Sequence, residues 1–204
     1  YTGLTADFNG SLSGSFGVAA SGAATYSIPL QLTPGTAGVT PSLSLVYNSH
    51  SGDGIVGRGW SVAGLDGSVA RCSSASHTVD YSSDDNFCLN GRLLVPIGTG
   101  TDGNGAYTEY RTELDGFQRI RSYGTAGNAP AEFRVWSQDG SVMYFGGTDG
   151  KLEGEGPNNG QVSRWLLVSY TDTSDNAYVI NYEEETDHAD VRVTSIEYGS
   201  NATE

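Results

Sequence analysis

The fold is decided by stretches such as EFRVWSQDGSVMYF, residues 132–145, in which two runs rich in β-branched and aromatic residues flank a short turn. Such runs on either side of a turn signal predict strands over 132–137 and 141–145, and the first run also alternates between polar Glu132 and Arg134 and apolar Phe133 and Val135. Asp139-Gly140 between them is a strong signal for a tight turn, because glycine accepts a positive φ without steric cost. The stretch therefore predicts an antiparallel β-hairpin.

The same alternation recurs along most of the chain. We expect further strands over residues 26–32, 42–47, 92–97, 107–114, 116–123, 164–170, 177–183 and 191–198. Pro29 has no N–H to donate, so its strand should lie at a sheet edge or be bulged there. No window shows the 3.6-residue period of an amphipathic helix. The sequence therefore predicts an all-β fold of many short antiparallel strands and hairpins with Gly, Asp and Asn turns. It leaves open whether these strands form a sandwich, a barrel or an open shell-type sheet.

Composition narrows the class of protein. The chain has 204 residues, of which 37% are hydrophobic, so we expect a single β domain over 1–204 with its own core. Its 24 acidic and 10 basic residues give a net charge of −14, which argues against a nucleic-acid partner. No apolar run is long enough to predict a membrane span. The chain opens at Tyr1 without a leader sequence, and we expect it to be a fragment of a larger secreted protein.

Cys72 and Cys88 are the two cysteines of the chain. A zinc site needs four ligands with close pairs, and the sequence has neither Cys-x-x-Cys nor paired histidines. Two interpretations remain, which are two free buried thiols or one structural disulfide. We favour the disulfide, because an acidic, lysine-poor and glycine-rich β chain is typical of exported proteins. A disulfide that closes a loop of this size would stabilise the fold by roughly 3 kcal/mol.

No motif predicts catalysis. Residues 52–57 match the glycine pattern of a dinucleotide-binding loop, but no helix follows to hold a pyrophosphate, so we interpret them as a tight turn. Acidic clusters such as Asp84-Asp85 are expected on solvated faces. The polar turns 102–105 and 172–176 offer oxygen ligands for a weakly bound surface calcium ion, although neither has EF-hand spacing. We therefore expect no enzyme, no catalytic residue and no cofactor beyond such a calcium ion.

The tryptophans are the candidates for ligand stacking. Trp60 and Trp165 sit among apolar residues, which predicts a place in the core. Trp136 shares its parity with Glu132 and Arg134, so its ring should be exposed on the polar face of the strand. An exposed tryptophan on a β scaffold can stack on the faces of sugar rings. Trp136 is therefore the candidate ligand-stacking aromatic, with polysaccharide as its partner.

The first third of the chain carries an ordered series of motifs, namely GAATYSIPL (22–30), PGTAG (34–38), PSLSLVYNS (41–49), GDG (52–54), GRGWS (57–61) and GL (64–65), followed by RC (71–72) and NFCLNG (86–91). The series resembles the SpvB-type N-terminal domain. This family is shared by virulence-plasmid B proteins, the B component of insecticidal toxin complexes and large secreted RHS/YD-repeat proteins. The resemblance is strongest over 1–91 and looser beyond, where 164–204 is similar to strand–turn–strand RHS units. The chain departs from the family at Thr33, Asp53 and Asp66, where Pro, Asn and Ser are frequent.

The resemblance implies a non-catalytic structural or interaction domain of a large secreted bacterial protein. In toxin complexes this region belongs to the shell that, together with RHS repeats, encloses a toxic cargo domain. The expected partners are therefore downstream RHS-type repeats of the same polypeptide and other toxin-complex subunits. Residues 8–52 contain no Asp, Glu, Lys or Arg and would then be a surface that the downstream chain buries. The competing interpretation of this segment is a flexible, hydroxyl-rich leader that lies on its own domain. The alternatives are a carbohydrate- or surface-binding module of a secreted protein and, last, a glycosidase with two carboxylates lining one cleft.

Overall fold

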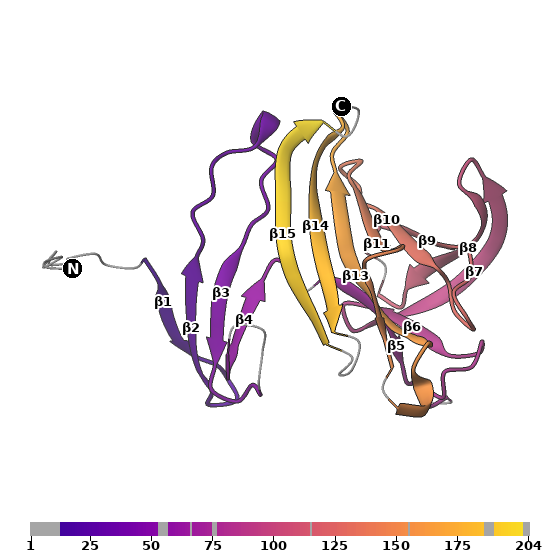
Figure 1. The fold of residues 1–204 in the computed structure, drawn as a ribbon, viewed down its shortest axis with the longest axis horizontal. Coiled ribbons are helices and arrows are strands. Elements are labelled where there is room, and N and C mark those ends of the chain that lie inside the picture. The colour runs from indigo at the N-terminus through magenta and orange to yellow at the C-terminus, as the bar shows by residue number, and fades with distance from the viewer. Residues whose placement is uncertain are drawn as a thin grey trace, which may run out of the picture. The chain divides into compact units, whose positions relative to one another are not determined.

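The protein is all-β, as the alternating pattern predicts (Figure 1). A computed structural model describes residues 13–52, 57–65, 67–74, 77–114, 116–154, 156–185 and 190–201. The glycine-rich match at 52–57 falls largely outside these residues. The chain divides into two compact units, one made of residues 1–31 and 42–64 and the other of residues 32–41 and 65–204. The described part of the chain contains no helix long and apolar enough to cross a membrane.

The first unit is an antiparallel sheet of four strands, in the order β1-β2-β3-β4. The strands are β1 (Ser15–Val18), β2 (Ala24–Pro29), β3 (Ser44–Asn48) and β4 (Trp60–Ala63). Because β2 lies inside this sheet, the expectation of an edge strand at Pro29 is wrong. The sheet accommodates Pro29 because it is the last residue of β2, and β1 pairs with β2 only as far as Ser27.

The second unit is built around a closed barrel. Its strands are β5 (Ser68–Cys72), β6 (Asn86–Leu89), β7 (Arg92–Asp102), β8 (Gly105–Thr112), β9 (Arg119–Tyr123), β10 (Glu132–Trp136), β11 (Val142–Gly146), β12 (Lys151–Glu153), β13 (Val162–Thr171), β14 (Asn176–Glu185) and β15 (Asp190–Asn201). Strands β5 to β11 pair in sequence order, and β13 pairs with both β5 and β11. These two pairings close an eight-stranded barrel, an outcome that the strand pattern left open.

Strand β13 belongs to the barrel and to a second feature at once. Its first half pairs with β5 and with the short β12, whereas its second half pairs with β11 and β14. From β14 the sheet continues to β15 through a long hairpin that lies outside the barrel (Figure 1). Two three-residue 3-10 helices, η1 (Thr36–Gly38) and η2 (Gly156–Asn158), lie in the connecting segments.

The core fills the barrel with aromatic rings. Phe87, Phe133 and Trp165 pack edge to face with ring centroids 5.2–5.4 Å apart. Trp165 has no exposed surface, which confirms its predicted place in the core, and its indole N–H donates to the Pro130 carbonyl at 2.9 Å. Trp60, in contrast, is only half-buried, on one face of the four-stranded sheet. Its apolar neighbours in the sequence reflect that face and not a closed core.

The position of Trp165 leaves no room for a side chain at Gly146, the last residue of β11. Its φ is +85°, and a Cβ placed there would lie 2.4 Å from Cδ1 of Trp165 and 2.9 Å from the Ala131 carbonyl oxygen. Gly160 has nearly the same φ, +82°, but a Cβ there would meet nothing within 4 Å. The two glycines therefore separate backbone strain from crowding in the core.

We predict that Gly146→Ala destabilises the protein much more than Gly160→Ala. Each alanine loses about 1 kcal/mol for the left-handed backbone. Crowding against Trp165 adds roughly 1–3 kcal/mol for Gly146→Ala alone. Urea unfolding of both variants measures the difference. Equal losses in the two variants would contradict the packing described for Trp165.

Candidate functional site

A buried ion pair lies at the base of the loop that joins β5 to β6. Arg71 Nη1 and Asp85 Oδ2 are 2.5 Å apart, and their side chains are 1% and 0% exposed. The guanidinium also donates to two backbone carbonyls, from Nε to Val162 at 2.7 Å and from Nη1 to Ser82 at 2.8 Å. A buried charge is strongly destabilising unless an opposite charge and hydrogen bonds compensate for its lost hydration. Arg71 therefore holds together β5, the start of β13 and the loop.

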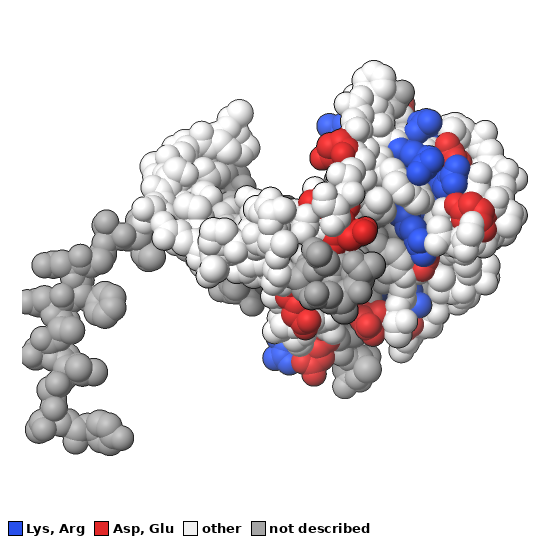
Figure 2. Space-filling view, turned by 90° about the horizontal axis from the view of Figure 1, so that it is seen from above, with Lys and Arg blue, Asp and Glu red and all other residues white. Residues whose placement is uncertain are grey.

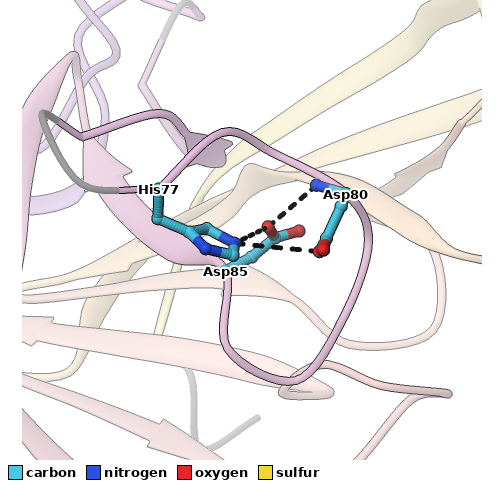
Figure 3. A group of neighbouring side chains, drawn as sticks. All are labelled: His77, Asp80 and Asp85. Atoms are coloured by element: carbon cyan, nitrogen blue, oxygen red, sulfur yellow. Dashed lines mark hydrogen bonds and ion pairs between the residues drawn. The ribbon is translucent and has the colours of Figure 1, made fainter.

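Both carboxylate oxygens of Asp85 have hydrogen-bond partners. Its Oδ1 accepts the Asp80 N–H at 3.0 Å and contacts His77 Nε2 at 2.9 Å (Figure 3). Its Oδ2 accepts the Tyr81 N–H at 2.8 Å in addition to the hydrogen bond from Arg71. Tyr81 has a positive φ of 62°, so a tight turn brings two consecutive N–H groups to one carboxylate. We call Arg71, Asp85 and His77 the charged knot. It fixes the loop against one end of the barrel.

The expectation that Asp84 and Asp85 both lie on a solvated face is wrong for Asp85. Asp84 is exposed, but Asp85 is 5% exposed as a whole residue. The sequence does contain a signal for the burial of Asp85. Side chains two residues apart in extended chain point the same way, and Phe87, two residues after Asp85, points into the barrel. Arg71 likewise shares its parity with the fully buried Val69. The sequence thus places Arg71 on the inner face of β5 and Asp85 directly before β6, in phase with the inward-facing Phe87.

His77 and Asp85, together with the neighbouring Asp80, have the residue types and the spacing of a possible metal site. Ligand atoms of His77, Asp80 and Asp85 lie within 4.8 Å of one another. Both oxygens of Asp85 already accept hydrogen bonds, however, and the permanent positive charge of Arg71 lies 2.5 Å from one of them. A divalent cation would face that charge. The donor set therefore fits an ion pair with hydrogen bonds better than a metal centre.

Cys72 and Cys88 are bonded in the structure, with an S–S distance of 2.07 Å. The bond joins β5 to β6 directly beside Arg71 and so closes the same loop as the knot. The loop is thus tied to the barrel twice, once covalently and once through charge. The two ties do not depend on the same chemistry, because reduction opens only the first.

The outer face of β8 to β11 carries a lattice of arginines and aromatic rings. Glu109, Arg121, Arg134 and Tyr144 form one cross-strand row. The Arg121 guanidinium contacts Glu109 at 2.8 Å and Asp102 at 2.9 Å. Burial, followed by its hydrogen bond to Glu132, raises the pKa of Tyr144 to about 12. Figure 2 shows Lys and Arg side chains gathering on one face of the larger unit.

Trp136 lies on this outer face, beside Arg134 on the same strand, and is half-buried. The Arg119 guanidinium lies over its ring, 4.4 Å from the ring centroid, and Arg121 is 5.9 Å from it. One face of the indole is therefore occupied by a cation–π contact within the chain. Stacking of a sugar ring on that face requires Arg119 to move away, and polysaccharide binding at Trp136 stays a prediction.

In the polar turns 102–105 and 172–176, the carboxylates of Asp102 and Asp172 accept hydrogen bonds from residues of the same turn. Asp102 accepts the Asn104 N–H at 2.8 Å, and this bond is the main cause of its lowered pKa. Asp172 accepts the Asn176 side-chain amide at 2.8 Å and the Ser174 N–H at 2.8 Å, and its pKa is lowered as well, chiefly by Asn176. Calcium at either turn stays a prediction.

The charged knot predicts opposite outcomes for two adjacent acids. Asp85→Ala leaves Arg71 buried without its counter-ion and should lower the free energy of unfolding by about 3–5 kcal/mol. Asp84→Ala, at the exposed neighbour, should change it by no more than about 0.5 kcal/mol. Urea unfolding measures both. A small loss in both variants would mean that the knot does not fix the loop.

The disulfide predicts a redox-dependent stability. The double variant Cys72→Ser/Cys88→Ser should lose roughly 3 kcal/mol, because its unfolded chain is no longer constrained by the closed loop. The native protein in dithiothreitol should lose the same amount, and the double variant should be insensitive to the reductant. If dithiothreitol leaves the unfolding curve of the native protein unchanged, the two thiols are free.

Comparison with known proteins identifies the family. The family model described as Salmonella virulence plasmid 65kDa B protein matches residues 18–203. No curated protein matches the chain. The fold is similar to solved structures of TcdB2-TccC3, with a TM-score of 0.75, 21% identity and 92% of this chain covered. It is also similar to the Photorhabdus luminescens Tc holotoxin pore, with a TM-score of 0.73, 23% identity and 87% of this chain covered.

A third structure is the N-terminal domain of the effector protein SpvB from Salmonella typhimurium strain LT2. It has a TM-score of 0.68 and 20% identity, and the match covers 87% of this chain and 65% of that one. In the two toxin structures the match covers 10% and 9% of the other chain, so this chain spans about a tenth of their length. The family model, in contrast, matches nearly all of the described residues. The chain therefore belongs to the SpvB family, that of the Salmonella virulence plasmid 65kDa B protein.

Proposed function

We propose that this chain is a non-catalytic scaffold module that forms part of a β shell in a large secreted bacterial toxin-type protein. In this function the module packs on downstream RHS-type repeats of the same polypeptide, and the assembled shell encloses a toxin cargo. Membership of the SpvB family and the likeness of the fold to toxin-complex structures support the proposal. A disulfide beside the charged knot fits an oxidising, extracytoplasmic location.

The observation that carries the proposal is the outer edge of β15 over residues 193–198. Within the described ranges, this twelve-residue strand pairs as a strand with β14 alone. A long edge strand presents a row of free N–H and C=O groups, which soluble proteins normally cover or disrupt. Near the C-terminal end of β15, Thr36 Oγ1 donates to the Gly199 carbonyl at 2.5 Å. The stretch 193–198 lies beside no strand other than β14 within the described ranges, and we propose it as the place where a further strand pairs.

The inner face of β15 supports the same conclusion. Val193 and Ile196 are half-buried and pack against the barrel core. Strands β13, β14 and β15 follow one another as an antiparallel meander, each paired with the one before. A further strand-turn-strand unit on β15 would continue both the hydrogen-bond ladder and this apolar face. Downstream RHS-type repeats have that form, and other toxin-complex subunits are the proposed partners of the assembled shell.

We predict that a charge on the inner face of β15 releases the module from its shell. Ile196→Lys places an ammonium where the next strand would cover apolar surface, a device that natural edge strands use against pairing. Glu197→Lys puts the same side chain one residue along, on the exposed outer face. After limited proteolysis of the polypeptide as its gene encodes it, the fragment 1–204 should stay bound with Glu197→Lys and separate with Ile196→Lys on size exclusion.

Circular dichroism of residues 1–204 alone shows whether each variant keeps its fold. If Ile196→Lys does not, Ile196→Thr replaces it, because threonine keeps the β-branched shape and still places a hydroxyl in the apolar face. Release of the unsubstituted fragment as a stable monomer contradicts the shell function. Retention of a folded Ile196→Lys fragment shows that β15 does not hold the module in place.

A further inference from the structure

The four-stranded sheet of the first unit has one continuous apolar face. Directly opposed residues of antiparallel strands lie on the same face. The registers therefore place Phe16, Tyr26, Tyr47 and Trp60 in one row across all four strands, and Ile28, Leu45 and Val62 in a second row beside it. The Tyr47 and Trp60 rings are 5.3 Å apart at their centroids.

The other face of this sheet has a different chemistry. Its central row is Ser15, Ser27, Val46 and Ser61. This face is small and hydroxyl-bearing, and it can remain in water. The sheet is therefore amphipathic, with a defined side that favours burial.

The apolar side is not buried within the first unit. Ala23 and Leu43 are the buried hydrophobic residues that the described part of this unit contains, and neither lies in the two apolar rows. Phe16 is 71% exposed and Val18, on the same face, is 68% exposed. A sheet that is apolar on one face is stable when another layer covers that face. The unit is one layer of a two-layer arrangement.

We infer that the apolar face of β1–β4 is covered by a second β-layer, apolar and uncharged on its facing side, which the same polypeptide supplies from outside residues 1–204. This inference rests on the proposed shell function and names the partner of a second surface, separate from the edge of β15. Sheets that pack face to face interdigitate their inner side chains at a spacing of about 10 Å. The mixed aliphatic and aromatic rows fit that packing.

Charge restricts the partner. Residues 8–52 contain no Asp, Glu, Lys or Arg, and Arg58 is the one residue of these four types that the structure describes in this unit. Figure 2 shows the corresponding part of the molecule free of coloured side chains on the face in view. Such a face offers no counter-ion, so a charged partner surface would lose its hydration without compensation. The covering layer is therefore uncharged where it touches the sheet.

The size of the face indicates a tethered partner. Four strands about 4.8 Å apart and about five residues long span an area of about 300 Å². A stable complex between separate proteins buries about 800 Å² on each partner. The face alone is too small to hold a free protein or a second copy of this chain. A layer in the same polypeptide binds at high effective concentration and needs less area.

Two single-cysteine variants on opposite faces of β1 test the inference. Val18→Cys places a thiol on the apolar face, and Ser15→Cys places one on the hydroxyl face, and both native residues are exposed. Maleimide labelling rates are compared in the polypeptide as its gene encodes it and in residues 1–204 alone, with the unsubstituted protein as background. We expect Cys at 18 to react at least about tenfold more slowly in the encoded polypeptide, and Cys at 15 to react equally in both.

Each other outcome overturns the inference. Equal labelling at position 18 in both proteins means that no additional layer covers the face. Slow labelling of residues 1–204 alone that depends on protein concentration assigns the face to a second copy. Failure here is distinguishable from failure of the shell function. The proteolysis of β15 variants can still show a bound fragment when position 18 is open, because an edge contact leaves this face exposed.

Discussion

The pairing of β11 with β13 is the interaction on which the structure depends, because it turns a strongly twisted sheet into a closed barrel. Without it, β11 would be a free edge and the aromatic core would be open on one side. The pairing buries Phe145 and Leu167 on opposed strands and brings Gly146 against Trp165. It also sets the course of the chain beyond the barrel, because the second half of β13 has two neighbours. One of them is β11, and the other, β14, leads out of the barrel.

This arrangement gives one module a closed and an open part. The closed part is the barrel, which has its own core. The charged knot and the Cys72–Cys88 bond fix its β5–β6 loop. The open part consists of β14 and β15, which extend from the barrel wall, and over residues 193–198 of the described chain β15 pairs as a strand with β14 alone. A shell element needs both properties, namely a folded anchor and a surface that accepts further strands.

The sequence predicted most of the strands, but it did not predict β1, β4, β5, β6 and β12, and it left the closure of the barrel open. Alternation and turn residues located the hairpins β10–β11 and β13–β14 and the strand β15, because those signals are local. Besides the β11–β13 pairing, closure requires β5 to pair with β13, almost a hundred residues away, and no local pattern encodes that contact. Asp85 was missed because its neighbour Asp84 suggested a solvated cluster. Its parity with Phe87 was the available signal that it points inward.

Amide hydrogen exchange over β15 tests the central claim most directly. Exchange of residues 190–201 is followed by mass spectrometry in the chain 1–204 alone and in the polypeptide as its gene encodes it. The account predicts that the outer-edge amides of β15 within residues 193–198 are protected only in the encoded polypeptide, while those of the barrel core strand β10 exchange equally slowly in both. Equal exchange of β15 in the two proteins would contradict the claim that its edge receives the next strand of a shell.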